Sequence, residues 1–184
     1  MIDKRIAIAT LLVATACSQQ DAATSNVAVE NASAAAAPAK PAVAKTPDQA
    51  FVDSAAANDA FAQAAGNLAK AKATRPAVKE FGQRTFDEHV QSMMRLKAAA
   101  ARLPGGGLVD PSLTPQLLGY LDVLQKAQGA AFDTAFVTQQ RQLHERAMQA
   151  MTGYAASGGN DSLKEYADYN SRRVRARLDR LREL

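Results

Sequence analysis

An amphipathic pattern between Pro76 and Pro104 restricts the fold more than any other feature of the chain. Apolar residues recur there at intervals of three and four positions, a spacing that aligns them on one face of an α-helix. The stripe consists of Val78, Phe81, Thr85, His89, Met93, Leu96, Ala100 and Leu103. Pro76 can begin such a helix, and Pro104 with the glycines that follow can end it. We therefore predict a long helix with one buried side.

Proline preceded by a capping residue marks two further helix starts. The segment Thr46-Pro47-Asp48-Gln49 combines an N-cap, a first-position proline and a glutamine that can complete a capping box. A helix is expected from this segment to about Ala73. The pair Thr114-Pro115 predicts a shorter helix that ends near Lys126.

Two more helices complete the predicted domain. One is expected over Gly129–Ala156, and the last follows Ser162, which can form a capping pair with Glu165. The chain has no alternating run of β-branched residues and no hairpin signal. Four long helices with short connections and one short extra helix predict an all-α antiparallel four-helix bundle over residues 46–184.

The first sixteen residues have the features of a signal peptide. Lys4 and Arg5 precede an apolar run, Ile6–Ala16, which is shorter than the about 20 residues that span a bilayer as a helix. The run ends in Ala14-Thr15-Ala16-Cys17, which resembles the lipobox of bacterial lipoproteins. Cys17 is the only cysteine, so no disulfide competes for it. The alternative is an ordinary signal peptide in which Cys17 has no role.

An acylated Cys17 would anchor the mature protein to a membrane. Serine rather than aspartate follows the cysteine, which in lipoproteins points to the outer membrane, with the protein facing the periplasm. Residues 17–45 are rich in alanine, serine, asparagine and proline and contain no aromatic residue. Such a composition cannot offset the entropy of ordering, so we expect a disordered tether between lipid and bundle.

The net charge of +4 is concentrated near the C-terminus, where residues 162–184 hold seven basic and four acidic side chains. Five arginines lie on the outer faces of the last predicted helix: Arg172, Arg173, Arg175, Arg180 and Arg182. They could contact anionic lipid or a cell-wall polymer. The alternative is a solvated helix face. No aromatic residues are interleaved with them in a nucleic-acid-binding pattern, so no nucleic-acid partner is expected.

Four segments resemble the domain-of-unknown-function 4142 family of exported, ferritin-like bacterial proteins. They are Phe51–Ala56, Phe81–His89, Gly129–Asp133 together with His144, and Arg177-Leu178. The resemblance implies a ferritin-like arrangement of the helices, and it implies no activity. The family usually has aspartate where this chain has Glu88, often tyrosine at Phe136, and commonly histidine at Arg177.

Five polar residues form the candidate site: Glu88, His89, Asp133, His144 and Arg177. Asp133 and His144 are eleven residues apart, about 20° in helical azimuth, so both lie on one side of their helix. A ferritin-type di-iron centre needs two Glu-x-x-His motifs, and neither histidine has glutamate three residues earlier. We predict a polar core network in which Arg177 pairs with Asp133 or Glu88 and sets helix register. A mononuclear metal site is the alternative.

No catalytic motif is recognised in the chain. The serines lack a Gly-x-Ser-x-Gly setting, and the glycines at 105–107 lack the lysine of a phosphate-binding loop. We therefore expect no catalytic residue and no cofactor. The favoured interpretation is a non-enzymatic interaction or structural module of the cell envelope. The alternative is a metal- or small-molecule-binding bundle that uses His89, His144, Asp133 and Glu88.

Overall fold

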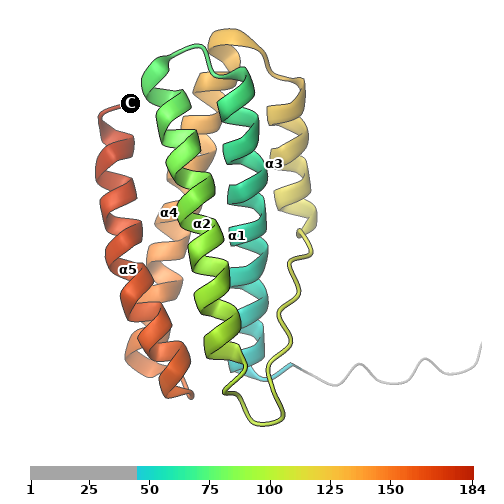
Figure 1. The fold of residues 1–184 in the computed structure, drawn as a ribbon, viewed down its shortest axis with the longest axis vertical. Coiled ribbons are helices and arrows are strands. Elements are labelled where there is room, and N and C mark those ends of the chain that lie inside the picture. Colours follow the sequence, from blue (N-terminus) through green and yellow to red (C-terminus); the bar gives the residue numbers. More distant parts are fainter. Residues whose placement is uncertain (1–44) are drawn as a thin grey trace, which may run out of the picture. The chain divides into compact units, whose positions relative to one another are not determined.

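The computed structural model describes residues 45–184, and this part of the chain contains helices and no strands. Figure 1 shows the helices, which are α1 Pro47–Lys72, α2 Pro76–Ala100, α3 Pro115–Lys126, α4 Gly129–Ser157 and α5 Asp161–Arg182. The predicted all-α class is confirmed. The signal peptide predicted for residues 1–16, Cys17, and the predicted tether up to residue 44 lie outside the described residues.

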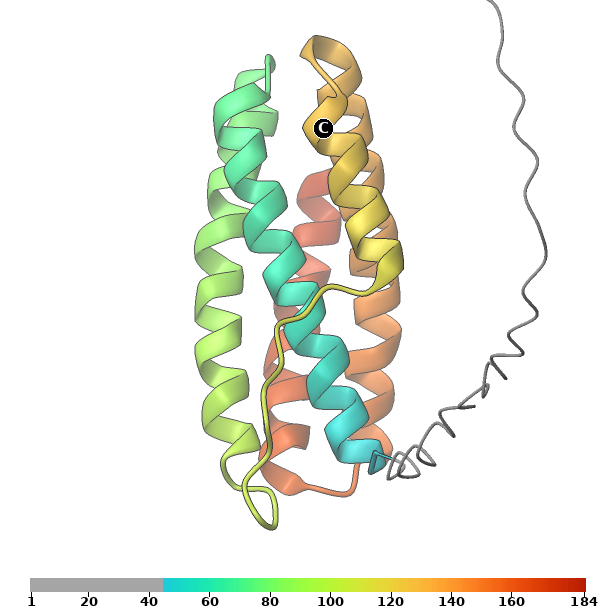
Figure 2. The same cartoon turned by 90° about the vertical axis from the view of Figure 1, so that its right-hand side faces the viewer.

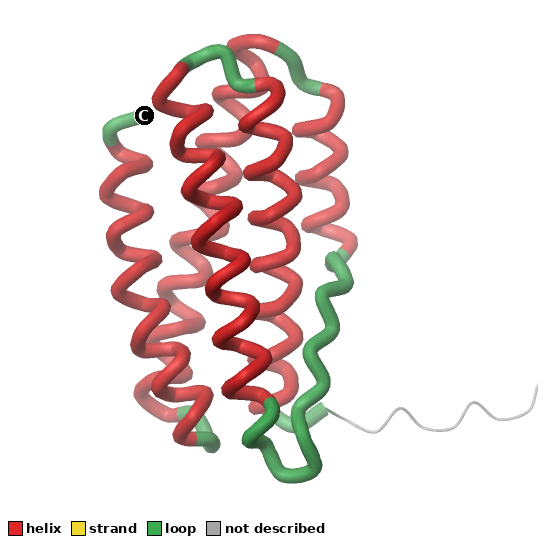
Figure 3. Tube along the Cα trace, in the orientation of Figure 1, coloured by secondary structure: helices red, strands yellow, loops and turns green. Residues whose placement is uncertain are grey.

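The four long helices pack as two antiparallel hairpins, α1 with α2 and α4 with α5. The hairpins contact each other through α1 with α4 and through α2 with α5, which closes a ring. The loop after α2 runs back along α1, and α3 then lies outside α1 and α4 (Figures 2 and 3). This long crossover returns the chain to the end of the domain where α2 began, so α2 and α4 run in the same direction.

The two threonine caps form as predicted. The Oγ1 atom of Thr46 accepts a hydrogen bond from the amide of Gln49 at 3.2 Å, and Thr114 accepts one from Leu117 at 3.3 Å. The capping box at the first helix is wrong, because the Gln49 side chain donates instead to Asp53 and to a loop carbonyl. The start of α1 is therefore held both by the Thr46 cap and by the hydrogen bond of Gln49 to the crossover loop.

The last helix starts one residue earlier than the predicted cap at Ser162. Asn160 is its N-cap, with extended backbone and with Oδ1 accepting from the amide of Leu163 at 3.1 Å. Ser162 lies inside the first turn of the helix, so the predicted capping pair of Ser162 with Glu165 is wrong.

The predicted apolar stripe of α2 continues past the end of the helix. The helix ends at Ala100, and the last stripe residue, Leu103, is buried in the turn that follows.

The core divides into two apolar clusters along the length of the bundle. One surrounds Val52, Leu96 and Leu163, near the start of α1. The other is richer in aromatic residues and surrounds Phe61, Phe132, Phe136, Leu124 and Leu181. Buried polar side chains from all four long helices lie between them, and the candidate site is built from these side chains.

Candidate functional site

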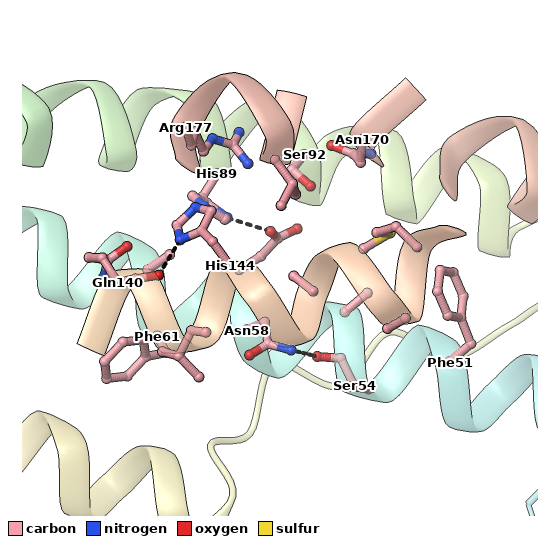
Figure 4. Close-up of a pocket in the computed structure, with 18 residues that line it drawn as sticks. Phe51, Ser54, Asn58, Phe61, His89, Ser92, Gln140, His144, Asn170 and Arg177 are labelled. Carbon is pink, nitrogen blue, oxygen red and sulfur yellow. Dashed lines mark hydrogen bonds and ion pairs between the residues drawn. The ribbon is translucent and has the colours of Figure 1, made fainter. Parts of the chain in front are cut away.

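Four of the five predicted site residues come together in the middle of the bundle. His89 comes from α2, His144 from α4 and Arg177 from α5 (Figure 4), and Glu88 precedes His89 on α2. The fifth, Asp133, lies elsewhere and is described below. Each of these helices supplies its residue because the position falls on the stripe that faces the other helices.

Arg177 pairs with Glu88, which is one of its two predicted partners. The guanidinium Nε donates to Glu88 Oε2 at 2.6 Å, and the Arg177 side chain is only 3% exposed. Arg180 donates to the other carboxylate oxygen at 3.2 Å from the surface side. Burial alone raises the pKa of Glu88, but the two arginines outweigh it and lower that pKa below its ordinary value. The pair therefore stays ionised and joins α2 to α5.

His89 pairs with Asp59 of α1, a residue that the sequence analysis did not place in the site. His89 Nδ1 lies 2.7 Å from Asp59 Oδ1, and both residues are buried. Burial lowers the pKa of His89 well below its ordinary value, so the ring is neutral. Burial raises the pKa of Asp59 to about 7, partly offset by the nearby Ser92 hydroxyl and by the charge of Arg177. When Asp59 is ionised, the ring must donate from Nδ1, which leaves Nε2 as an acceptor.

His144 is held by its own helix. Its Nδ1 lies 2.7 Å from the backbone carbonyl oxygen of Gln140. A carbonyl oxygen can only accept, so Nδ1 carries the proton and Nε2 has a free lone pair. Burial lowers the pKa of His144 to about 3, with the nearby Arg177 charge contributing. The ring lies 5.7 Å from that of His89, at 75° to it.

Several polar atoms at this centre have no hydrogen-bond partner within residues 45–184. They are Nε2 of both histidines, Nη2 of Arg177, Oδ2 of Asp59 and both side-chain polar atoms of Gln140. All five residues line one cavity of about 50 Å³ (Figure 4). Buried polar groups in proteins are nearly always hydrogen-bonded. Hydrogen-bond donors and acceptors without a partner in the described residues therefore gather at this one cavity.

Asp133 belongs to a different part of the molecule, so the prediction that it joins the network is wrong. Its carboxylate accepts from the amide and hydroxyl of Thr74 at 3.1 and 2.6 Å, and from the amide of Arg75 at 2.9 Å. Burial alone raises its pKa, but these hydrogen bonds outweigh burial and lower it. Eleven residues correspond to a rise of about 16 Å along a helix, so sharing a side with His144 does not bring the two together.

Other polar residues of the centre were not among the predicted site residues. Gln140 and Asn170 are buried on the stripes of α4 and α5, and Ser92 lies 3.0 Å from the hydroxyl of Tyr166. A sequence signal exists for Asp59, since it falls among the buried alanines of α1. The helical spacing places Asp59 on the buried side of its helix, and its partner on α2 explains why a charged residue is buried there.

The donor set of the centre differs from that of a metal site. Within residues 45–184, no three histidine, cysteine, aspartate or glutamate side chains are close enough together to hold a metal ion. The two imidazoles share their cavity with a guanidinium, whose charge disfavours a cation. Hydrogen bonding is the chemistry that these residues offer best.

The outer arginines of α5 are largely engaged on their own helix. Arg172 donates to Asp168 at 2.5 Å, Arg182 to Asp179 at 2.7 Å, and Arg173 to the Tyr169 hydroxyl at 3.1 Å. Arg175 is exposed. A surface depression of about 310 Å³ is lined by three of the arginines, Arg172, Arg173 and Arg180, together with Glu88. Contact with an anionic surface stays a prediction.

The fold and the centre define an all-α domain with a central cavity that is lined by all four long helices. The chain belongs to the family described as Domain of unknown function (DUF4142), which it matches over residues 31–184. No curated protein and no solved structure matches it. In the part of the chain that the structure describes, none of the helices is both long and apolar enough to cross a membrane.

Proposed function

We propose that the described helices form a four-helix bundle of the ferritin-like type. The support is the closed ring of contacts among α1, α2, α5 and α4, together with a single long crossover between two hairpins. The short α3 belongs to the crossover. An experimental structure in which the hairpins pair in another order would contradict this assignment.

We also propose that the protein is an exported lipoprotein, anchored through Cys17 to the outer membrane and facing the periplasm. The lipobox-like sequence before Cys17 and the serine after it support this location. Mass spectrometry of the mature N-terminus tests it: the expected product begins at an acylated Cys17. A mature chain that starts elsewhere, or a Cys17→Ser variant that fractionates like the unaltered protein, would contradict the anchor.

For the bundle, we propose a non-enzymatic binding role in which a small polar molecule occupies the central cavity. One observation carries this proposal: both imidazoles are anchored through Nδ1, and both have Nε2 unpartnered at the same cavity within residues 45–184. Anchoring fixes the ring orientation and, at His144, the tautomer. The binding atoms are therefore held in place before a ligand arrives, which reduces the entropy cost of binding.

Nuclear magnetic resonance of the two ring systems tests the binding role. The chain contains only two histidines, so the side-chain spectrum can be assigned from two variants, His89→Asn and His144→Asn. Asparagine retains a donor near the Nδ1 position and removes Nε2. A panel of small molecules and Zn²⁺ is added to the purified lipid-free domain. Displacement of both Nε2 signals by a small molecule is expected. If no small molecule moves either signal, the role is refuted, and stoichiometric zinc uptake lost in both variants would establish the metal alternative.

A second candidate function is contact with an anionic envelope surface. The observation that favours it is the depression where three arginines gather around Glu88. Each basic residue near a charged surface contributes about 1 kcal/mol to binding. Co-sedimentation with anionic vesicles or cell-wall material should therefore fall in Arg172→Gln/Arg173→Gln, which replaces two residues of the depression, and no change would contradict it. Lys79→Gln/Lys97→Gln, at two exposed sites on α2, is the matched control.

A further inference from the structure

Resting on the binding role proposed above, we infer that the ligand is a small uncharged molecule with both hydrogen-bond donors and acceptors. We further infer that it reaches the cavity through the seam between α1 and α4. Two sets of observations lead to this inference: the charges at the cavity wall, and the residues that the cavity shares with an outer groove.

Groups of opposite charge lie close together in the cavity wall. Within residues 45–184, Arg177 Nη2 and Asp59 Oδ2 have no hydrogen-bond partner. The charge of Arg177 disfavours a cation, and the charge of Asp59, when ionised, disfavours an anion. Transferring any ion from water to a buried site carries a large desolvation cost, and it is recovered only by an opposite charge without a competing one nearby. An uncharged molecule avoids this cost and can satisfy both groups.

The hydrogen-bonding pattern specifies the ligand further. The lone pair of His144 Nε2 requires an N–H or O–H donor, as does His89 Nε2 while Asp59 is ionised. Arg177 Nη2 requires an acceptor oxygen. A primary amide or a short diol supplies both kinds of group. The cavity of about 50 Å³ limits such a molecule to a few non-hydrogen atoms, far below the size of drug-like ligands.

The seam between α1 and α4 connects this cavity to the surface. A larger groove of about 560 Å³ lies outside it, bounded by α1, α4, the crossover and the start of α3. Ser54 and Asn58 of α1 and Leu143, Ala147 and Ala150 of α4 line both the groove and the cavity. Ser54 and Ala150 are exposed. Leu143 is the large side chain of this shared set, and the small side chains at the other positions obstruct passage less.

Asn58, which lines both spaces, forms its side-chain hydrogen bond with its own helix. Its side-chain amide donates to the carbonyl of Ser54 at 2.9 Å, one turn earlier on α1 (Figure 4). It therefore makes its bond along α1 instead of across to α4.

Ligand class is tested with three probes of similar size and different charge. Acetamide, formate and methylammonium are titrated into the lipid-free domain while the histidine Nε2 signals are followed. Acetamide is expected to shift both signals, and the two ions are expected to leave them unchanged at equal concentration. Binding by formate or methylammonium alone would overturn the uncharged class while leaving the binding role intact. No response to any of the three overturns the inference.

The route is tested with two tryptophan substitutions at exposed alanines of α4. Ala150→Trp places a large ring at the seam, whereas Ala131→Trp lies on the same helix away from groove and cavity. Acetamide exchange should slow by about tenfold or more in the seam variant, since access then requires a conformational change. The control should exchange like the unaltered domain. Equal exchange in both variants would overturn the route without affecting the evidence for binding.

Discussion

Asp133 and the central cavity are both buried and polar, yet their hydrogen bonding differs. Both oxygens of Asp133 accept bonds, three in all, from Thr74 and Arg75. At the centre, His89, His144, Asp59 and Arg177 each have one anchored polar atom or ion pair and another atom without a partner in residues 45–184.

The difference separates a structural role from a binding role. The bonds of Asp133 join α4 to the start of α2, where Arg75 as N-cap provides no side-chain cap of its own. All the hydrogen bonds that Asp133 accepts therefore stabilise the fold. At the centre the anchored atoms orient the groups, and the remaining atoms face a shared cavity. The following substitutions test whether stability and binding depend on different regions of the domain.

Arg177→Leu is expected to have the largest effect on stability. It removes the buried partner of Glu88, and breaking a buried pair should lower the free energy of unfolding by about 3 kcal/mol. Chemical denaturation measures the loss. Arg180→Leu is the matched control, because Arg180 bonds the same carboxylate but is 43% exposed and should contribute only about 0–1 kcal/mol. Equal losses in the two variants would contradict the importance of burial.

Asp133→Ala should lower the free energy of unfolding by about 2 kcal/mol, because the amides of Thr74 and Arg75 lose their acceptor. Binding of acetamide at the centre, followed by the histidine signals, should persist in the folded variant. Loss of binding in a fully folded Asp133→Ala protein would show that the two regions are coupled and would remove the distinction.

His144→Asn should show the converse behaviour, with acetamide binding lost and stability at pH 7 changed by less than about 1 kcal/mol. Its effect appears in acid. The pKa of His144 is about 3 in the folded state and 6.5 in its ordinary range. Between these values the unfolded chain binds a proton that the fold does not, so stability falls as pH decreases below 6.5. His144 alone should therefore lower the free energy of unfolding by about 2 kcal/mol between pH 7 and pH 5.

Chemical denaturation of the unaltered domain and of His144→Asn at both pH values measures this pH-dependent loss of stability. The loss between pH 7 and pH 5 should be smaller in the variant by this amount. Other titrating groups are common to the two proteins, so they cancel in the difference. The same loss in both would mean that His144 takes up a proton in the folded state.

Local patterns predicted the helices because their causes are local. Proline after threonine starts α1 and α3, and the spacing of apolar residues predicts the buried side of α2. The site was predicted less completely. The stripe position of Arg177 and the charge of Glu88 indicated their pairing, whereas helical azimuth alone placed Asp133 with His144 and neglected the rise along the axis.

By itself, the sequence determined the helical class, most helix boundaries and which side of each helix is buried, since these depend on residues a few positions apart. Only the tertiary structure decided that Asp59 meets His89 across thirty positions, that Asp133 binds the backbone just before α2, and that atoms without a partner in residues 45–184 converge on one cavity. Contacts between helices depend on their relative axial positions, which loops and packing set together. No single helix carries that information in its own pattern of residues.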